Sequence, residues 1–111
     1  MSESKFYGML GLARRSGNII IGFDRVVEAI RNGIADVVLV SADCSAKTKK
    51  RVEDKCGSYG AELITFGTSA KIGRAIGFAD AAVLAVTDNN FAEAIKNIYN
   101  NLTEVAENGS C

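Results

Sequence analysis

Two uninterrupted apolar runs, Val37–Val40 and residues 82–86, restrict the fold of this chain more than any other feature of its sequence. A strand without polar alternation is buried on both faces of its sheet, so helices have to cover both sides of that sheet. Two shorter segments rich in β-branched residues, Ile19–Ile21 and residues 63–66, add two more predicted strands. Because 111 residues support one hydrophobic core, we expect a single α/β domain.

Glycines and capping residues indicate helices that alternate with these strands. Ser45 and Thr68 are suitable N-caps, and Gly17, Gly33 and Gly77 stand where helices would end. The five predicted helices span residues 4–16, 23–32, 46 to about 57, 69–76 and about 88–102. The predicted fold class is therefore a three-layer α/β/α sandwich with a four-stranded mixed sheet, in the order αβαβαβαβα. We assign residues 1–103 to this single domain and expect a frayed tail over residues 104–111.

The composition excludes several classes of function. Without histidine, the chain has no imidazole to act as a base, a proton shuttle or a metal ligand. Its cysteines, Cys44, Cys56 and Cys111, are widely spaced and form no CxxC pair, which argues against a disulfide framework and a zinc site. No segment has the length and flanks of an export signal or a membrane span. We therefore expect a cytoplasmic protein, and nothing in its sequence requires more than a monomer.

Two enzymatic functions have partial support. A nucleotide site needs a glycine-rich loop after a strand, but residues 67–73 match one only superficially, and a turn followed by a helix cap explains them better. Cys44 lies between a predicted buried strand and a helix start, where a thiol can be activated. A thiolate phosphatase places an arginine six positions after its cysteine, whereas position 50 is Lys and Arg51 comes one residue late. A catalytic thiol at Cys44 therefore stays a distant alternative.

Charge is distributed unevenly along the chain, although the formal net charge is zero. Residues 1–75 hold 12 basic against 8 acidic side chains, and residues 76–111 hold one basic against five acidic side chains. The basic residues available for phosphates are Arg14, Arg15, Arg25, Lys47, Lys49, Lys50, Lys71 and Arg74. Such residues beside strand-end loops favour nucleic-acid binding, but a solvated helix face explains the basic run 44–55 equally well.

Several spaced motifs occur in an order that is typical of a known family. They are residues 8–17 (GMLGLARRSG), 22–33 (GFDRVVEAIRNG), 37–43 (VVLVSAD), 54–56 (DKC), 72–77 (IGRAIG) and 85–88 (AVTD). On these motifs the chain resembles the small bacterial YlxQ-type proteins of the ribosomal protein L-seven-Ae superfamily. The resemblance covers nearly everything from Phe6 to Ile98. It implies an α/β/α fold and binding of structured, kink-turn RNA, with no catalysis, no cofactor and no small-molecule substrate.

The resemblance also implies where the RNA would bind. Kink-turn binders have a glycine after the first strand, an Asn-Glu pair and then a Lys at the start of the next helix, and an apolar loop before the last strand. The corresponding positions are Gly22, Asp24, Arg25, Glu28 and residues 76–80. Asp24 cannot donate as an Asn amide does, Arg25 reverses the sign of the usual Glu, and Glu28 replaces an attraction by a repulsion.

The sequence therefore predicts a protein related to ribosomal proteins that recognises folded RNA through the loop after its first strand. The residues assigned to this RNA are Gly22, Asp24, Arg25, Glu28, Arg14, Arg15, Lys47, Lys50, Ile76, Gly77 and Phe78. The sequence does not identify the partner RNA, which can be ribosomal. Because Asp24, Arg25 and Glu28 depart from the kink-turn pattern, a preference for kink-turns is left open. The alternative is a protein-interaction or regulatory module that kept the fold and lost RNA recognition, with the acidic final third of the chain and Asp24 and Glu28 serving a partner protein.

Overall fold

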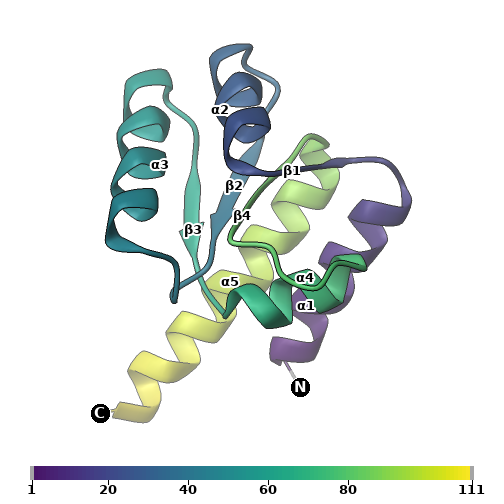
Figure 1. Cartoon of the computed structure of the whole chain (residues 1–111). Coiled ribbons are helices and arrows are strands. Elements are labelled where there is room, and N and C mark those ends of the chain that lie inside the picture. The colour runs from purple at the N-terminus through teal and green to yellow at the C-terminus, as the bar shows by residue number, and fades with distance from the viewer. Residues whose placement is uncertain (1, 111) are drawn as a thin grey trace.

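The structure is a computed structural model, which describes the backbone of residues 2–110 and the side chains of residues 3–102. Within the described residues the helices are α1 (Ser2–Arg15), α2 (Phe23–Arg31), α3 (Ala46–Tyr59), α4 (Ser69–Ile76) and α5 (Asn89–Ser110). The strands are β1 (Ile19–Ile21), β2 (Val37–Val40), β3 (Leu63–Thr65) and β4 (Val83–Val86). The predicted alternation αβαβαβαβα is confirmed (Figure 1).

The sheet is mixed, as predicted, and its strands lie in the order β1-β4-β2-β3. β2 pairs parallel with β3, whereas β4 pairs antiparallel with both β1 and β2. The register places Ile21 opposite Leu84 and Val40 opposite Val83. β1, β2 and β3 therefore run in the same direction, and their carboxyl ends meet at one edge of the sheet together with the amino end of β4.

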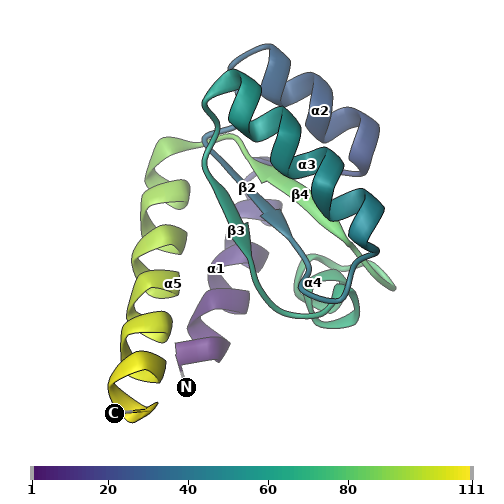
Figure 2. The same cartoon turned by 90° about the vertical axis from the view of Figure 1, so that its left-hand side faces the viewer.

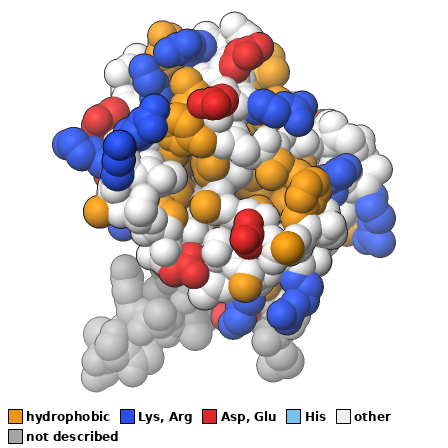
Figure 3. All heavy atoms as spheres, viewed as in Figure 1, with side chains coloured by type: hydrophobic (Ala, Val, Ile, Leu, Met, Phe, Trp, Pro, Cys, Tyr) orange, Lys and Arg blue, Asp and Glu red, His pale blue; other side chains and the backbone are white. Residues whose placement is uncertain are grey.

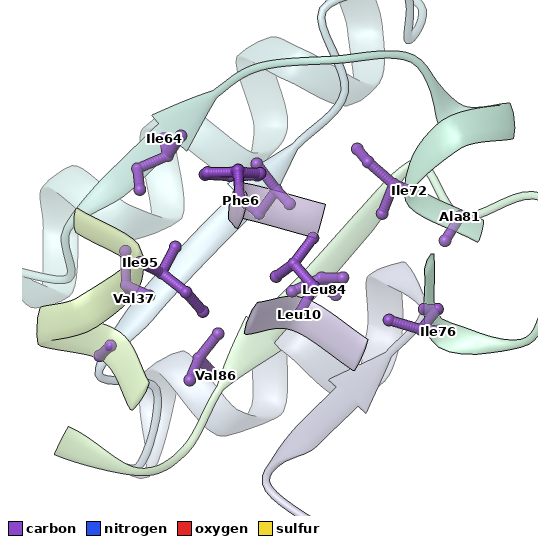
Figure 4. Close-up of a cluster of buried hydrophobic side chains, with 12 residues drawn as sticks. Phe6, Leu10, Val37, Ile64, Ile72, Ile76, Ala81, Leu84, Val86 and Ile95 are labelled. Atoms are coloured by element: carbon purple, nitrogen blue, oxygen red, sulfur yellow. The ribbon is translucent and has the colours of Figure 1, made fainter. Parts of the chain in front are cut away.

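Helices cover both faces of the sheet, which explains the two uninterrupted apolar runs. α2 and α3 lie on one face, and α1 and α5 lie on the other (Figure 2). Along β2, the side chains of Val37 and Leu39 enter the cluster beneath α1, α4 and α5, while Val38 enters the cluster beneath α2 and α3. Figure 4 shows the first of these clusters, in which Phe6 and Leu10 of α1 pack over the strands. Each fully buried aliphatic side chain contributes about 1.5–3 kcal/mol to folding.

Several element boundaries differ from the expected ones, including those of α3, β3 and β4. α3 continues through Gly57 and ends at Gly60, which adopts a left-handed conformation with φ of 71° and donates its N–H to the carbonyl of Cys56. Val52 and Cys56 lie four residues apart on one face of α3, and both side chains are buried. The helix extends past Cys56, so that both residues pack against the core. β3 ends one residue earlier than expected, and β4 begins one residue later.

The carboxyl end of the chain is described in part. α5 is recorded to Ser110, but the side chains of residues 103–110 and the whole of residue 111 lie outside the described residues. The expected frayed tail over residues 104–111 falls there, so that expectation and the domain bounds 1–103 stay predictions. Within the described part of the chain, no helix combines the length and the apolar character needed to cross a membrane.

Candidate nucleic-acid interface

Four loops gather where β1, β2 and β3 end and β4 begins, and we call this surface the loop edge. It consists of Gly22 and residues 41–45, 66–68 and 77–82. The N–H of Ala42 donates to the carbonyl of Gly67 at 2.8 Å, which joins the loops after β2 and β3. The N–H of Ser69 donates to the Asp43 carboxylate at 3.0 Å, and the N–H of Ala81 donates to the carbonyl of Ser69 at 2.9 Å. The loop edge is therefore one connected surface.

The start of α2 differs from the starts of α3 and α4 at the same edge. The hydroxyls of Ser45 and Thr68 cap α3 and α4, each accepting from an N–H three residues later at 3.1 Å. α2 follows Gly22, which has φ of 102°, and no side chain accepts from its first turn. The first N–H groups of a helix have no partner within that helix, so α2 presents its own to an acceptor from outside.

Gly22 also connects the start of α2 to β4. Its N–H donates to the carbonyl of Val83 at 3.3 Å, which extends the pairing of β1 and β4 by one residue. Its φ lies in the region that strains every residue with a Cβ, so position 22 requires glycine for its backbone conformation. The loop 77–82, which leads into β4, therefore ends directly beside the start of α2.

The charged residues assigned to the start of α2 are all exposed, and two of them lie together. Arg25 and Glu28 line a hollow of about 140 Å³, together with Asn32. Ile20 of β1, Ala29 and Ile34 also line this hollow. Asp24 is exposed and does not line the hollow. The start of α2 thus combines free N–H groups with charges of both signs.

α3 brings further basic side chains to the loop edge. Lys47 and Lys50 are exposed near its first turn. Arg51, which was not assigned to the site from the sequence, places its guanidinium carbon 4.3 Å from the centre of the Phe23 ring. This cation–π contact joins α3 to the start of α2. The contact between Arg51 and Phe23 could not be predicted from their spacing in the sequence, because it depends on how α2 and α3 pack.

The apolar loop before β4 corresponds to the expected one in part. Ile76 is only 4% exposed, because Ile72 and Ile76 form the i, i+4 stripe that turns toward the core. Little of the Ile76 side chain is therefore open to RNA, although Ile76 is among the residues that line a hollow between α1 and α4. Gly77 ends α4 with φ of 85°. Phe78 is 45% exposed, and the Arg14 guanidinium carbon lies 5.7 Å from the centre of its ring.

The loop 77–82 lies tightly against α4. A Cβ at Gly73 would lie 2.5 Å from the Cα of Asp80, so only glycine at position 73 allows the loop this close approach. The N–H of Phe78 donates to the carbonyl of Gly73 at 2.7 Å, which holds the loop in place. The position of Phe78 is therefore set by α4.

Arg14 and Arg15 lie apart from the start of α2, on the other side of this loop. They line a hollow of about 530 Å³ between α1 and α4, and Arg74 lines it with them. In the view of Figure 1, Lys and Arg side chains lie over α3 and over the end of α1 (Figure 3). Hydrophobic side chains lie between these two basic areas, and some acidic ones are interspersed (Figure 3).

Comparisons with known proteins find a family model and relatives that cover most of the chain. The model of the ribosomal protein L7Ae/L30e/S12e/Gadd45 family matches residues 4–96. "RNA-binding protein YlxQ" of Bacillus subtilis (strain 168) is 39% identical over 95 residues, which are 86% of this chain and 95% of that protein. "Large ribosomal subunit protein eL30" of Tetrahymena thermophila is 26% identical over 86% of this chain and 94% of its own length.

Two solved structures have the same fold. A protein of unknown function from Bacillus halodurans C superposes with a TM-score of 0.83 at 36% identity, covering 85% of this chain and 95% of its own. The Giardia lamblia 15.5kD RNA binding protein superposes with a TM-score of 0.72 at 16% identity, covering 96% of this chain and 88% of its own. At that identity, the second likeness concerns the fold alone.

Proposed function

Because the chain belongs to the ribosomal protein L7Ae/L30e/S12e/Gadd45 family, we propose that it binds structured RNA through the loop edge. The relative that is 39% identical over most of the chain carries the name of an RNA-binding protein. The loop edge supplies what such binding needs, because backbone N–H groups and basic side chains position the phosphates while a few polar groups face the bases.

The start of α2 is the observation that carries this proposal. Among the three helices that begin at the loop edge, it alone lacks a side-chain cap within the described residues. An uncapped helix start attracts anions through its free N–H groups and its macrodipole. Arg25 stands in the first turn and is exposed, so it can contact a phosphate or the O6 and N7 atoms of a guanine.

Kink-turn recognition is weakened in this chain, according to the chemistry of its side chains. Asp24 lacks the amide donor of an Asn, and Glu28 repels a phosphate that a Lys would attract. Each lost base contact costs about 1–3 kcal/mol. Two such losses weaken a kink-turn complex by roughly two to four decades relative to a chain that makes both contacts. We therefore assign to the loop edge a general affinity for folded RNA with little preference for kink-turns.

Binding titrations with three RNAs of equal length test this function. The RNAs are a kink-turn, a plain hairpin and a single strand, each labelled with a fluorophore. We expect the two folded RNAs to bind more tightly than the single strand, with similar affinities for each other. A protein that binds none of the three, and that leaves cells free of nucleic acid, would be the interaction module and not an RNA-binding protein.

A triple variant tests the reason given for the lost preference. Asp24→Asn, Arg25→Glu and Glu28→Lys together restore the pattern that the resemblance associates with kink-turns. We expect this variant to bind the kink-turn at least about a hundredfold more tightly than the hairpin. Equal affinity for both RNAs would show that the start of α2 does not decide the preference.

A further inference from the structure

The hollow between α1 and α4, which we call the arginine groove, carries charge that the start of α2 does not explain. Arg14 and Arg15 stand in the last turn of α1, and Arg74 stands in the last turn of α4. All three side chains are exposed, and all three line the groove, whose volume is about 530 Å³. This volume falls within the range of sites that bind small ligands, about 300–1,000 Å³.

Two glycines of α1, Gly8 and Gly11, line the arginine groove together with Tyr7, Ala75, Ile76 and Gly77. A Cβ at Gly8 would meet no atom within 4 Å, so the space above this residue is empty of protein. At Gly11, a Cβ would lie 3.0 Å from the carbonyl oxygen of Ala75, so this glycine lets α1 and α4 approach each other. The groove therefore has open space above Gly8 and a close contact between α1 and α4 at Gly11, and three arginines line it.

No salt bridge includes these arginines within the described residues, although Arg74 also lines a neighbouring hollow with Glu3 and Lys71. The ion pairs of the described residues join Lys71 to Glu3 at 3.1 Å and Lys96 to two glutamates, and none includes an arginine. Arginine at the end of a helix also complements the helix dipole. That effect accounts for each arginine on its own helix, but not for their convergence from two helices on one hollow lined by no carboxylate.

The loop 77–82 connects the arginine groove to the start of α2. At one end, Phe78 lies under the guanidinium of Arg14, and at the other end Val83 accepts from the N–H of Gly22. Val83 is five positions after Phe78, so the two residues lie at most about 18 Å apart. An RNA strand of several nucleotides is long enough to span this distance.

We propose that the arginine groove is a second phosphate-binding site, which holds the RNA strand that extends from the start of α2. Arg15 and Arg74 bind its phosphates, and Arg14 is held over the Phe78 ring beside them. This inference rests on the proposed function, since it extends the path of the same RNA along the protein. It assigns Arg74 and the open space above Gly8 to RNA binding, and it makes the groove a source of affinity independent of base sequence.

The variant Arg15→Ala/Arg74→Ala tests the charge of the groove, with the hairpin RNA as the probe. Each hydrogen-bonded charge pair lost weakens binding about tenfold, so we expect about a hundredfold loss in affinity. The slope of log affinity against log salt should become shallower by about 1.5 to 2, because two phosphate contacts are lost. The matched control is Arg31→Ala, which removes an exposed arginine from the last turn of α2, at the opposite edge of the sheet.

Gly8→Leu tests the space in the groove without changing any charge. The new side chain enters the open space above Gly8, and replacing a glycine inside a helix favours folding. We expect circular dichroism to show an intact fold and an unchanged or raised Tm, with at least about tenfold weaker binding of the hairpin.

The outcomes separate this inference from the proposed function. If the natural chain does not bind the hairpin at all, the proposed function itself is wrong. If the natural chain binds and Arg25→Glu weakens binding, but Arg15→Ala/Arg74→Ala and Gly8→Leu bind as tightly as the natural chain, the arginine groove is not an RNA site. Loss of affinity in both groove variants, with none in Arg31→Ala, supports it.

Discussion

The start of α2 and the arginine groove lie at the two ends of the loop 77–82. They differ in charge, because the first has side chains of both signs and the second has only basic ones among its charged residues. At the start of α2, Arg25 shares its hollow with Glu28, and free N–H groups lie beside charges of both signs. In the groove, arginines and glycines line the space, and no carboxylate does. Mixed donors and acceptors can discriminate between RNAs, whereas positive charge alone adds affinity. If the proposed function is right, the start of α2 distinguishes folded RNA from a single strand, and the arginine groove adds affinity that does not depend on base sequence.

The largest expected effect comes from reversing a charge at the start of α2. Arg25→Glu replaces an attraction by a repulsion beside Asp24 and Glu28, so we expect hairpin affinity to fall by about a hundredfold or more, measured by fluorescence anisotropy. Arg31→Glu makes the same charge change at the far end of the same helix, and its loss should stay below about threefold. Equal losses in the two variants would mean that only net charge matters, and the comparison would fail.

The loop that connects the two regions depends on a glycine in α4. Gly73→Ala forces a methyl group against the backbone of Asp80, and such overpacking costs about 1–3 kcal/mol in the free energy of unfolding. Urea denaturation measures this loss. Gly8→Ala is the matched control, because its methyl group meets nothing and should stabilise α1 by about 0.5–1 kcal/mol. If both variants were equally stable, the loop 77–82 would not be held by α4.

Removing a repulsion at the start of α2 should strengthen binding. Glu28→Lys changes the local charge by two units beside Arg25, and we expect hairpin affinity to rise about tenfold. Glu53→Lys makes the same change on the exposed side of α3 and should raise affinity less. A weaker complex in Glu28→Lys would show that this glutamate contacts the RNA favourably.

The smallest effect is expected at the thiols, which belong to neither region. Burial raises the pKa of Cys56, so its thiol stays protonated at neutral pH and should react slowly with alkylating agents until the protein unfolds. Cys44 is half-buried at the loop edge, and Cys44→Ser should change RNA affinity by less than about twofold. A large loss of binding in Cys44→Ser would show that the Cys44 thiol contributes to RNA binding.

The sequence was sufficient for the layers of the fold but not for the arrangement of the site. Burial of all four residues of β2 could be predicted, because the run Val37–Val40 has no polar alternation. The strand order β1-β4-β2-β3 could not, since it depends on contacts between segments far apart in the chain. That order determines which loops share an edge.

Individual site residues show the same division. Position 22 was assigned from its glycine and its place after a strand, and the structure gives it the conformation that only glycine adopts readily. The burial of the Ile76 side chain was not anticipated, because the loop assignment overlooked the stripe that Ile76 forms with Ile72 toward the core. Two other features bring residues of different helices together. They are the contact of Arg51 with Phe23 and the shared hollow of Arg74 and Arg14, and no local sequence pattern predicts either of them.

The salt dependence of hairpin binding by the natural chain tests the central claim most directly. If the start of α2 and the arginine groove together neutralise about three or four phosphates, log affinity should fall against log salt with a slope of roughly −2 to −4. A slope close to zero, or no binding at low salt, would contradict an RNA interface at the loop edge.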